Sequence, residues 1–397
     1  SNSSAASDVY KRQDIEHVRS RFIKHFDGTT GFIYASPGRI NLIGEHTDYN
    51  GGFVFPGAVD KGMIAEIKPN GTDKVRAYSI DLKDYVEFGL NEEDAPRASW
   101  ARYIFGVCRE MIKRGVDVKG FNTAFSGDVP LGAGMSSSAA LESTYAFALN
   151  ELFGENKIDK FELAKVGQAT EHNYCGVNCG IMDQFISANG KKGMALKLDC
   201  ATLEYELVPM NNESVSVLVL DSAVKHSLAD GAYGQRRKQC EEASAIMGVP
   251  SLREATLELL ESFKEQLGDV RYRRARHVIG ENARVNAFAN ALARGDWDEA
   301  GVAMRGSHAS LRDDYEVSCA EVDTLVSLCD RIPSASSIYG ARMTGGGFGG
   351  CIVALVKTED VDKVARELLD GYCQETGIET TYLVTCAGEG ARVLYQA

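Results

Sequence analysis

The sequence lacks the features of several protein classes. Among its 397 residues no apolar run reaches the length of a membrane-spanning helix, and no apolar core of a signal peptide follows the N-terminus. Basic residues are fewer than acidic ones, and the net charge of −13 argues against a nucleic-acid partner, which normally requires a basic face. We therefore expect a cytoplasmic protein with no membrane and no nucleic-acid partner.

Several nucleotide-binding motifs are also missing. The chain has no Gly-x-x-x-x-Gly-Lys-Ser/Thr motif and no His-Arg-Asp or Asp-Phe-Gly set, so neither a P-loop nor a protein-kinase fold is predicted. Residues 345–350 satisfy Gly-x-Gly-x-x-Gly but precede an expected strand, which argues against a dinucleotide site. The ten cysteines are scattered, and only Cys175 and Cys179 lie close together, so we expect reduced thiols without a metal cluster.

The length of the chain exceeds what one hydrophobic core usually supports, so we expect two domains, 14–210 and 211–397. Residues Ser1–Gln13 are small and polar and are interpreted as a flexible leader. Strands and helices mix without strict alternation, which favours an α+β fold. The expected helices are 14–25, 100–114, 136–152, 161–174, 233–246, most of 254–302 and 361–375; the expected strands are 31–35, 53–54, 62–68, 74–79, 122–126, 194–198, 204–208, one from 215, 351–356 and 380–385.

The most informative stretch is Gly38–Gly52, in which acids, amides, an arginine and a histidine surround a short apolar centre. Its polar residues follow neither the period of a half-buried strand nor that of an amphipathic helix. Carboxylates accept hydrogen bonds and amides both donate and accept, which suits a ligand rich in hydroxyl groups. The alternative is a polar surface turn.

A second stretch, Val129–Ala140, has two glycines followed by three serines and leads into an expected helix. The first N–H groups of a helix have no internal partner and, with the helix dipole, attract anions. The stretch therefore fits a phosphate site, with a serine hydroxyl available to Mg²⁺. A capped helix without a ligand is the alternative.

A third stretch carries two acids, Glu171 and Asp183. Asp183 lies in an apolar Gly-Ile-Met setting, so a partner is needed to keep it ionised, and Arg39 is the natural candidate. Without further information Asp183 is equally well interpreted as a helix cap.

Together these stretches closely resemble the galactokinase family, one of the GHMP small-molecule kinases. Gly38–Gly52 resembles the galactokinase signature, Val129–Ala140 the ATP phosphate loop, and Met343–Cys351 the third GHMP motif. The resemblance implies a two-domain GHMP α+β fold with the active site in the cleft between the domains. It also implies ATP-dependent, Mg²⁺-dependent phosphorylation of the C1 hydroxyl of α-D-galactose, the first step of galactose catabolism, by a monomer.

The resemblance also implies roles for individual residues. Asp183 acts as base or stabilises charge, and Arg39 orients it. Ser138 and Glu171 hold Mg²⁺. Sugar-binding residues are Glu45, His46, Thr47, Asp48, Asp183 and Tyr233, and nucleotide-binding residues are Gly132, Ala133, Gly134, Met135, Ser136, Ser137 and Ser138.

One segment departs from the family pattern. Galactokinases usually have Ser-Glu-Tyr-Asn where this chain has Gly231-Ala232-Tyr233-Gly234, which leaves the sugar preference open. The alternatives are a related sugar 1-kinase acting on N-acetylgalactosamine or arabinose, and a non-catalytic galactose sensor. The intact Ser136–Ala140 run argues against the sensor, since sensors of this family have lost residues there.

Overall fold

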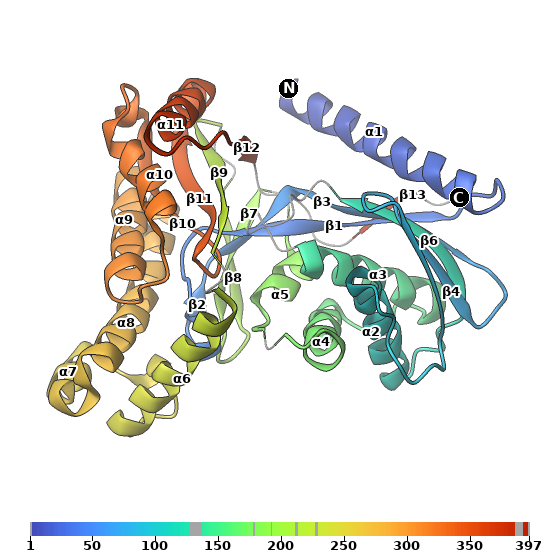
Figure 1. Ribbon diagram of the computed structural model, residues 1–397, viewed down its shortest axis with the longest axis horizontal. Coiled ribbons are helices and arrows are strands. Elements are labelled where there is room, and N and C mark those ends of the chain that lie inside the picture. Colours follow the sequence, from blue (N-terminus) through green and yellow to red (C-terminus); the bar gives the residue numbers. More distant parts are fainter. Residues whose placement is uncertain are drawn as a thin grey trace.

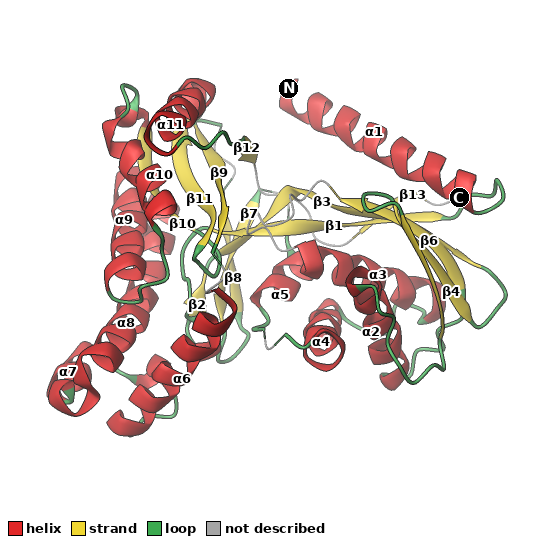
Figure 2. Cartoon of the chain, in the orientation of Figure 1, coloured by secondary structure: helices red, strands yellow, loops and turns green. Residues whose placement is uncertain are grey.

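The computed structural model describes residues 2–127, 137–177, 179–191, 193–210, 213–226, 229–385 and 392–395. Two β-sheets with helices packed against them form the molecule (Figure 1, Figure 2). The helices are α1 Asn2–His25, α2 Ser99–Lys113, α3 Ser137–Phe153, α4 Lys160–Thr170, α5 Met182–Asn189, α6 Ala229–Met247, α7 Leu257–Ser262, α8 Lys264–Arg294, α9 Trp297–Asp313, α10 Ala320–Arg331 and α11 Val361–Thr376. The strands are β1 Phe32–Asn41, β2 Phe53–Val54, β3 Pro56–Pro69, β4 Lys74–Ser79, β5 Asp84–Gly89, β6 Phe121–Gly127, β7 Met194–Asp199, β8 Tyr205–Pro209, β9 Val215–Lys225, β10 Ile338–Met343, β11 Gly349–Lys357, β12 Tyr382–Thr385 and β13 Arg392–Tyr395.

The first sheet has nine described strands, six of them in the order β13-β1-β3-β6-β4-β5. Strand β7 pairs with β3, and it also pairs with β2 and with β8. Helices α2–α5 cover one face, and α1 lies across the other (Figure 1). Val18 and Phe22 of α1 are buried against this second face beside Ile80 and Ala124. The sheet is therefore covered on both sides, which explains why its long strands do not alternate between apolar and polar residues.

The second sheet has four strands in the order β10-β11-β9-β12 and packs against α6–α11. A separate apolar cluster joins the two parts of the chain. It contains Ile40, Leu42 and Phe55 from the first part, with Phe288 and Val353 from the second. The signature segment thus begins inside the core that the two parts share.

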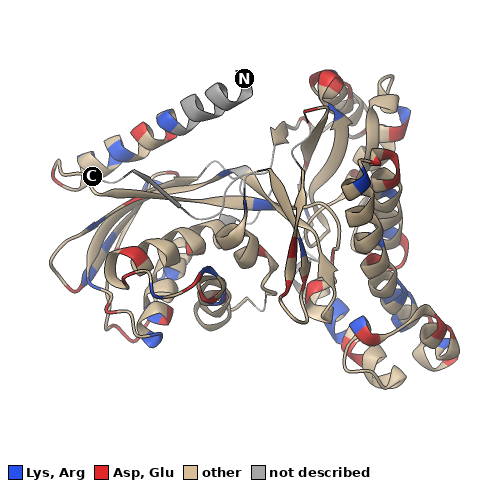
Figure 3. Ribbon diagram, turned by 180° about the vertical axis from the view of Figure 1, so that it is seen from behind, with Lys and Arg blue, Asp and Glu red and all other residues tan. Residues whose placement is uncertain are grey.

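Acidic and basic residues are interspersed along the outer helices of the second part (Figure 3). Within the described residues, no helix combines the length and the apolar character needed to cross a membrane. The nine cysteines described are free thiols.

Two expectations about the N-terminal region are wrong. Residues expected to form a flexible leader continue α1 back to Asn2, which is possible because the segment has no Pro or Gly and polar residues are compatible with a helix. The signature segment was expected to follow no strand period, yet Gly38–Asn41 complete β1. A register shift between Pro37 and Arg39 and burial on both faces remove the alternation.

Among the described helices and strands, five were not expected from the sequence: β5, α5, α10, β10 and β13. The last described strand, β13, pairs antiparallel with β1, Tyr395 opposite Ile33, so the end of the chain returns to the first sheet. The division into 14–210 and 211–397 remains a prediction, and its boundary residues 211 and 212 lie outside the described residues.

Candidate active site

After the end of β1 the signature segment forms a closed loop, residues 42–52, that leads to β2. The amide nitrogen of Asn41 donates to the carbonyl of Gly44 at 3.0 Å, and its oxygen accepts from the N–H of Phe55 at 3.3 Å. The buried hydroxyl of Thr47 donates to the carbonyl of Phe53 at 2.6 Å. Asn41 and Thr47 therefore hold the loop in shape, so the proposed sugar contact of Thr47 competes with a bond inside the protein.

Helix α8 fixes the backbone of Glu45 from one side. The carboxylate of Glu281 accepts from the N–H of Glu45 at 3.2 Å, and His277 Nε2 donates to its carbonyl at 3.0 Å. Glu281 is fully buried, which by itself would raise its pKa, but the charges of Arg284, His277 and Arg342 outweigh this and lower the pKa to about 2. The ionised carboxylate of Glu281 thus holds the backbone of the loop at Glu45.

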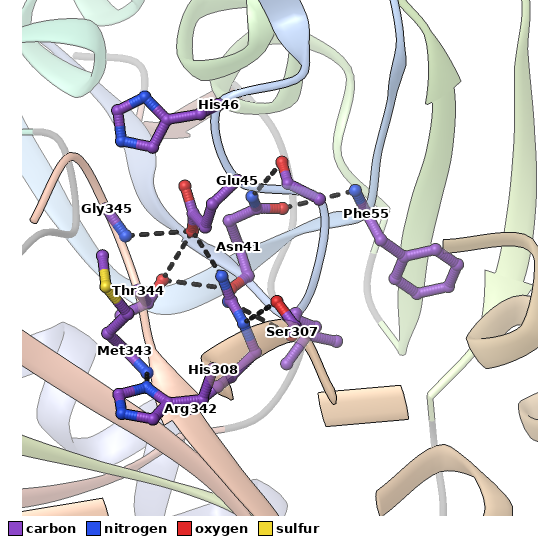
Figure 4. Close-up of polar contacts among 12 residues, drawn as sticks. Asn41, Glu45, His46, Phe55, Ser307, His308, Arg342, Met343, Thr344 and Gly345 are labelled. Carbon is purple, nitrogen blue, oxygen red and sulfur yellow. Dashed lines mark hydrogen bonds and ion pairs between the residues drawn. The ribbon is translucent and has the colours of Figure 1, made fainter. Parts of the chain in front are cut away.

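The side chain of Glu45 points toward β10 and the glycine loop that follows it (Figure 4). Its Oε1 accepts from the N–H of Gly345 at 2.9 Å and the hydroxyl of Thr344 at 3.3 Å, and it lies 3.3 Å from Nη2 of Arg342. Arg342 is completely buried and also donates to the carbonyl of Asn41 at 3.0 Å. Glu45 therefore connects the signature segment to the glycine-rich segment Met343–Cys351.

His46 uses both ring nitrogens. One contacts the carbonyl of Gly346 at 2.9 Å, which requires Nε2–H to donate, and Nδ1 contacts the hydroxyl of Tyr49 at 2.8 Å. Burial lowers the pKa of His46, so a neutral ring that accepts from Tyr49 fits this pattern. In this structure His46 binds protein groups with both nitrogens.

Asp48 begins a 3₁₀ turn, Asp48–Asn50, and faces the loop before α5. Gly180 packs directly against it, because a Cβ built at Gly180 would lie 2.1 Å from Oδ2 of Asp48. Burial, together with the charge of Asp183, raises the pKa of Asp48 to about 6. Asp48 is therefore an acid that changes charge just below neutral pH.

Arg39 and Asp183 form the expected pair. Nε of Arg39 donates to Oδ1 of Asp183, and Nη2 lies 3.3 Å from Oδ2, so the guanidinium contacts both carboxylate oxygens. Burial alone would lower the pKa of Arg39, but the charge of Asp183 raises it overall. Asp183 lies in the first turn of α5 and is not its cap, which is Ile181. Its side chain is 29% exposed against 9% for Arg39, so the pair has one face open to solvent.

Ser138 and Glu171 also meet, although 33 positions separate them. The hydroxyl of Ser138, in the first turn of α3, donates to Oε1 of Glu171 at 2.8 Å. Glu171 begins a short π-helical turn after α4, and its side chain is buried. The expected phosphate-loop residues Gly132, Ala133, Gly134, Met135 and Ser136 lie outside the described residues, as does the side chain of Ser137.

Sequence reasoning missed two groups beside this pair. Glu142 follows Ser138 by one helical turn and is buried; burial and the charge of Glu171 raise its pKa well above the usual range. Its Oε2 accepts from Gln184 at 3.2 Å, while Oε1 has no hydrogen-bond partner within the described part of the chain. Gln184 is the neighbour of Asp183, so this contact links α3 to the helix of Asp183. Glu142 lies just beyond the Val129–Ala140 stretch and Gln184 directly follows Asp183, but no local pattern marks either residue.

Tyr233, on α6, completes the cluster. Its ring centroid lies 5.5 Å from that of His46 and 5.3 Å from that of Tyr49. Burial, followed by the charges of Asp48 and Asp183, raises its pKa, so its hydroxyl stays neutral near both acids. The structure thus brings Arg39, Glu45, His46, Asp48, Asp183 and Tyr233 into one region, built from both parts of the chain.

Comparison with known proteins matches this arrangement. The galactokinase galactose-binding signature matches residues 20–69, and the N-terminal and C-terminal GHMP kinase domains match residues 102–191 and 288–373. A galactokinase of Chloroflexus aurantiacus is 42% identical over 388 residues, which cover 96% of this chain and 98% of that protein. The chain belongs to the galactokinase family. A second galactokinase, from Chloroflexus aggregans, is 41% identical over 96% of the chain and 98% of its own length.

Solved structures agree with the assignment to the galactokinase family. The Lactococcus lactis galactokinase, crystallised with galactose, superposes with a TM-score of 0.89 at 34% identity and covers 95% of this chain and 98% of its own. The Methanococcus jannaschii mevalonate kinase, at 18% identity and a TM-score of 0.66, covers 91% and 99% and shares the fold. The GHMP α+β fold class predicted from the sequence is confirmed.

Proposed function

We propose that this member of the galactokinase family transfers the γ-phosphoryl group of ATP to the C1 hydroxyl of α-D-galactose. Contact of Arg39 with both oxygens of Asp183, beside the signature loop, is the observation that supports it most directly. In the proposed reaction the C1 oxygen bonds to the γ-phosphorus, the bond from that phosphorus to the β–γ bridging oxygen breaks, and ADP leaves. We further propose that the protein works as a monomer in the cytoplasm.

Asp183 is proposed to receive the proton of the C1 hydroxyl. Its exposed face gives the hydroxyl access, and Arg39 keeps the carboxylate ionised and oriented. Because phosphoryl transfer has a loose transition state with charge spread over the phosphoryl oxygens, a fixed cation near the acceptor also stabilises that charge. Arg39 would fill both roles.

Asp48 and Tyr233 are the proposed sugar-binding groups whose polar atoms face the same region as Asp183. Glu45, His46 and Thr47 remain proposed sugar contacts. Since their described hydrogen bonds are to protein groups, a sugar hydroxyl has to share or replace one of those bonds. We expect these three residues to contribute mainly by fixing the loop that carries Asp48.

Mg²⁺ is proposed to bind between Ser138 and Glu171. Mg²⁺ prefers oxygen ligands and usually takes only one or two from the protein. A hydroxyl and a carboxylate in contact at 2.8 Å, with the buried oxygen of Glu142 nearby, offer donors of that kind. When bound, the ion would offset the negative charge of the nucleotide phosphates. The N-terminus of α3 is the proposed site for those phosphates.

The proposed activity is tested by incubating the full chain with ATP, Mg²⁺ and a panel of sugars, and measuring ADP release. We expect galactose to be the preferred substrate over glucose, N-acetylgalactosamine and arabinose, with phosphate attached at C1. A preference for either of the last two sugars would instead indicate the related sugar 1-kinase. Galactose binding without turnover would indicate the sensor.

The metal assignment predicts that Glu171→Gln and Ser138→Ala raise the Mg²⁺ concentration for half-maximal rate. Galactose affinity without nucleotide should change little in both variants. The double variant should lose less than the sum of the single losses, because residues holding one ion act as a unit. Calorimetry of nucleotide binding with and without Mg²⁺ provides a readout independent of turnover.

Glu162→Gln, which removes a half-exposed acid of α4 that contacts Lys165 and Arg114, is the matched control for that experiment. Its Mg²⁺ dependence should equal that of the unaltered protein. Ordinary Mg²⁺ dependence in Glu171→Gln, combined with a lower melting temperature, would show that Glu171 is a structural acid.

The raised pKa of Asp48 predicts that galactose binding depends on pH. Since its pKa is about 6, Asp48 is a carboxylate at pH 7.5 and becomes protonated as the pH falls through 6. Hydrogen bonds to a charged acceptor are roughly twice as strong as neutral ones, so affinity should fall about tenfold toward pH 5. A raised carboxyl pKa means that protonation favours the folded state, so unfolding of the site through Asp48 does not explain the loss.

Calorimetry with galactose between pH 5 and 8 measures this effect. Asp48→Asn should bind weakly at every pH and show no inflection near 6. An unchanged inflection in that variant would assign the titration to another group.

A further inference from the structure

Three side chains of different chemistry converge outside the candidate active site. His226 follows the end of β9, Cys319 precedes α10, and Glu321 lies in the first turn of α10. One ligand atom from each lies within 4.8 Å of the other two, and Nε2 of His226 is 3.1 Å from Oε2 of Glu321. Tetrahedral zinc, bound at about 2.0–2.3 Å, separates its ligand atoms by roughly 3.3–3.8 Å. Only small side-chain movements are needed to reach that spacing.

Backbone hydrogen bonds hold the two segments side by side. The N–H of His226 donates to the carbonyl of Phe348 at 2.8 Å, and the N–H of Phe348 donates to the carbonyl of Val317 at 2.7 Å. Gly347 permits this approach: its φ is +102°, and a Cβ there would lie 2.2 Å from the carbonyl oxygen of Val317. Phe348 therefore fixes His226 relative to the segment that leads into Cys319.

The start of α10 is fixed independently. The N–H of Asp323 donates to the carbonyl of Cys319 at 2.9 Å. The carboxylate of Asp323 accepts from the hydroxyl of Ser318 at 2.7 Å and contacts Nε2 of His308 at 2.9 Å. The backbone that carries Cys319 is thus held before any ion binds, which reduces the ordering needed on binding.

The side chains can be reached from solvent. Those of His226 and Glu321 are 46% and 25% exposed, and Cys319 is half-buried. In the structure Glu321 contacts His226 as an ion pair and the thiol of Cys319 through a side-chain hydrogen bond, so the three ligand groups already converge. One nitrogen, one sulfur and one oxygen ligand match the donor preferences of zinc, and a thiolate disfavours Mg²⁺.

We propose that His226, Cys319 and Glu321 bind one zinc ion, with solvent in the fourth position. The ion connects the end of β9 to the start of α10, next to the loop that carries Phe348. It is separate from the proposed Mg²⁺ site, which uses only oxygen ligands. Binding at this site does not depend on the proposed kinase activity.

Cobalt provides the test, because Co²⁺ occupies zinc sites and reports thiolate ligation and tetrahedral geometry in its absorption spectrum. The full chain, freed of metal with a chelator that is then removed, is titrated with Co²⁺. We expect one equivalent to produce a thiolate-to-cobalt charge-transfer band and intense visible bands, and Zn²⁺ to abolish both. Cys319→Ser should lose the charge-transfer band, while His226→Gln and Glu321→Gln should each weaken Co²⁺ binding more than about tenfold.

Cys373→Ser and His172→Gln serve as matched controls, since they remove a thiol of α11 and an exposed imidazole elsewhere. Both should bind Co²⁺ as the unaltered protein does. Absence of the band in the unaltered protein, or its persistence in Cys319→Ser, would overturn the proposal. Because His226→Gln changes an exposed residue and should fold normally, unchanged Co²⁺ affinity in that variant would also overturn it.

Discussion

Replacement of Asp183 by Asn is expected to lower kcat for galactose by about 10²–10⁴-fold while galactose still binds. The amide keeps the shape of the carboxylate, but it cannot take the proton of the C1 hydroxyl or balance the charge of Arg39. Steady-state kinetics gives the kcat, and calorimetry without nucleotide gives the galactose affinity.

Glu375→Gln is the matched control. It also removes a carboxylate that contacts an arginine through two 2.9 Å contacts, but the pair with Arg331 lies on the exposed surface of α10 and α11. Its kcat should stay at the level of the unaltered protein. A kcat of Asp183→Asn within tenfold of that level would exclude Asp183 as the proton acceptor.

Replacement of Arg342 by Met is expected to lower the free energy of unfolding by about 3–5 kcal/mol, the usual cost of removing one partner of a buried ion pair. Arg342 donates to the hydroxyl of Ser307 at 3.1 Å and to the carbonyls of Asn41 and Leu42 at 3.0 and 3.3 Å. Its loss leaves Glu45 without this cation and removes one donor from each of these acceptors; the carbonyl of Asn41 keeps the hydroxyl of Thr344. Denaturant unfolding followed by circular dichroism measures the change.

Two further variants distinguish the cost of breaking the buried ion pair from the cost of losing side-chain packing. Arg331→Met makes the same substitution at an exposed arginine and should change the free energy of unfolding by less than about 0.5 kcal/mol. Adding Glu45→Gln to Arg342→Met should recover part of the loss, because the uncompensated buried charge is gone. A double variant less stable than Arg342→Met would show that Glu45 stabilises the loop mainly through Thr344 and Gly345.

Two of the residue pairs singled out from the sequence are in contact in the structure, and both join residues in dense local patterns. Arg39 with Asp183 and Ser138 with Glu171 each join two polar stretches that stand out from their surroundings. The roles assigned to these pairs remain predictions. The resemblance, more than the residue types, identified the partners, since a carboxylate in an apolar segment also fits a helix cap.

The residues that support the site could not be predicted in the same way. Glu281, His277 and Arg342 occur singly within regular elements, and each contacts the signature across more than 200 positions of sequence. A lone acid or base in a helix or strand ordinarily faces solvent, so only the packed structure reveals that these are buried. The missed helix α5 has eight residues, too few for a helical period to be evident.

The pairing of β13 with β1 has a consequence for the order in which the protein can fold during synthesis. Strand β1 is synthesised well before β13, because the other strands of both sheets lie between them in the sequence. Until then one edge of β1 has free N–H and C=O groups, and an open edge of this kind pairs readily with other chains. We therefore expect a chain truncated before residue 392 to aggregate more readily than the full chain, although it still contains the candidate active-site residues named above.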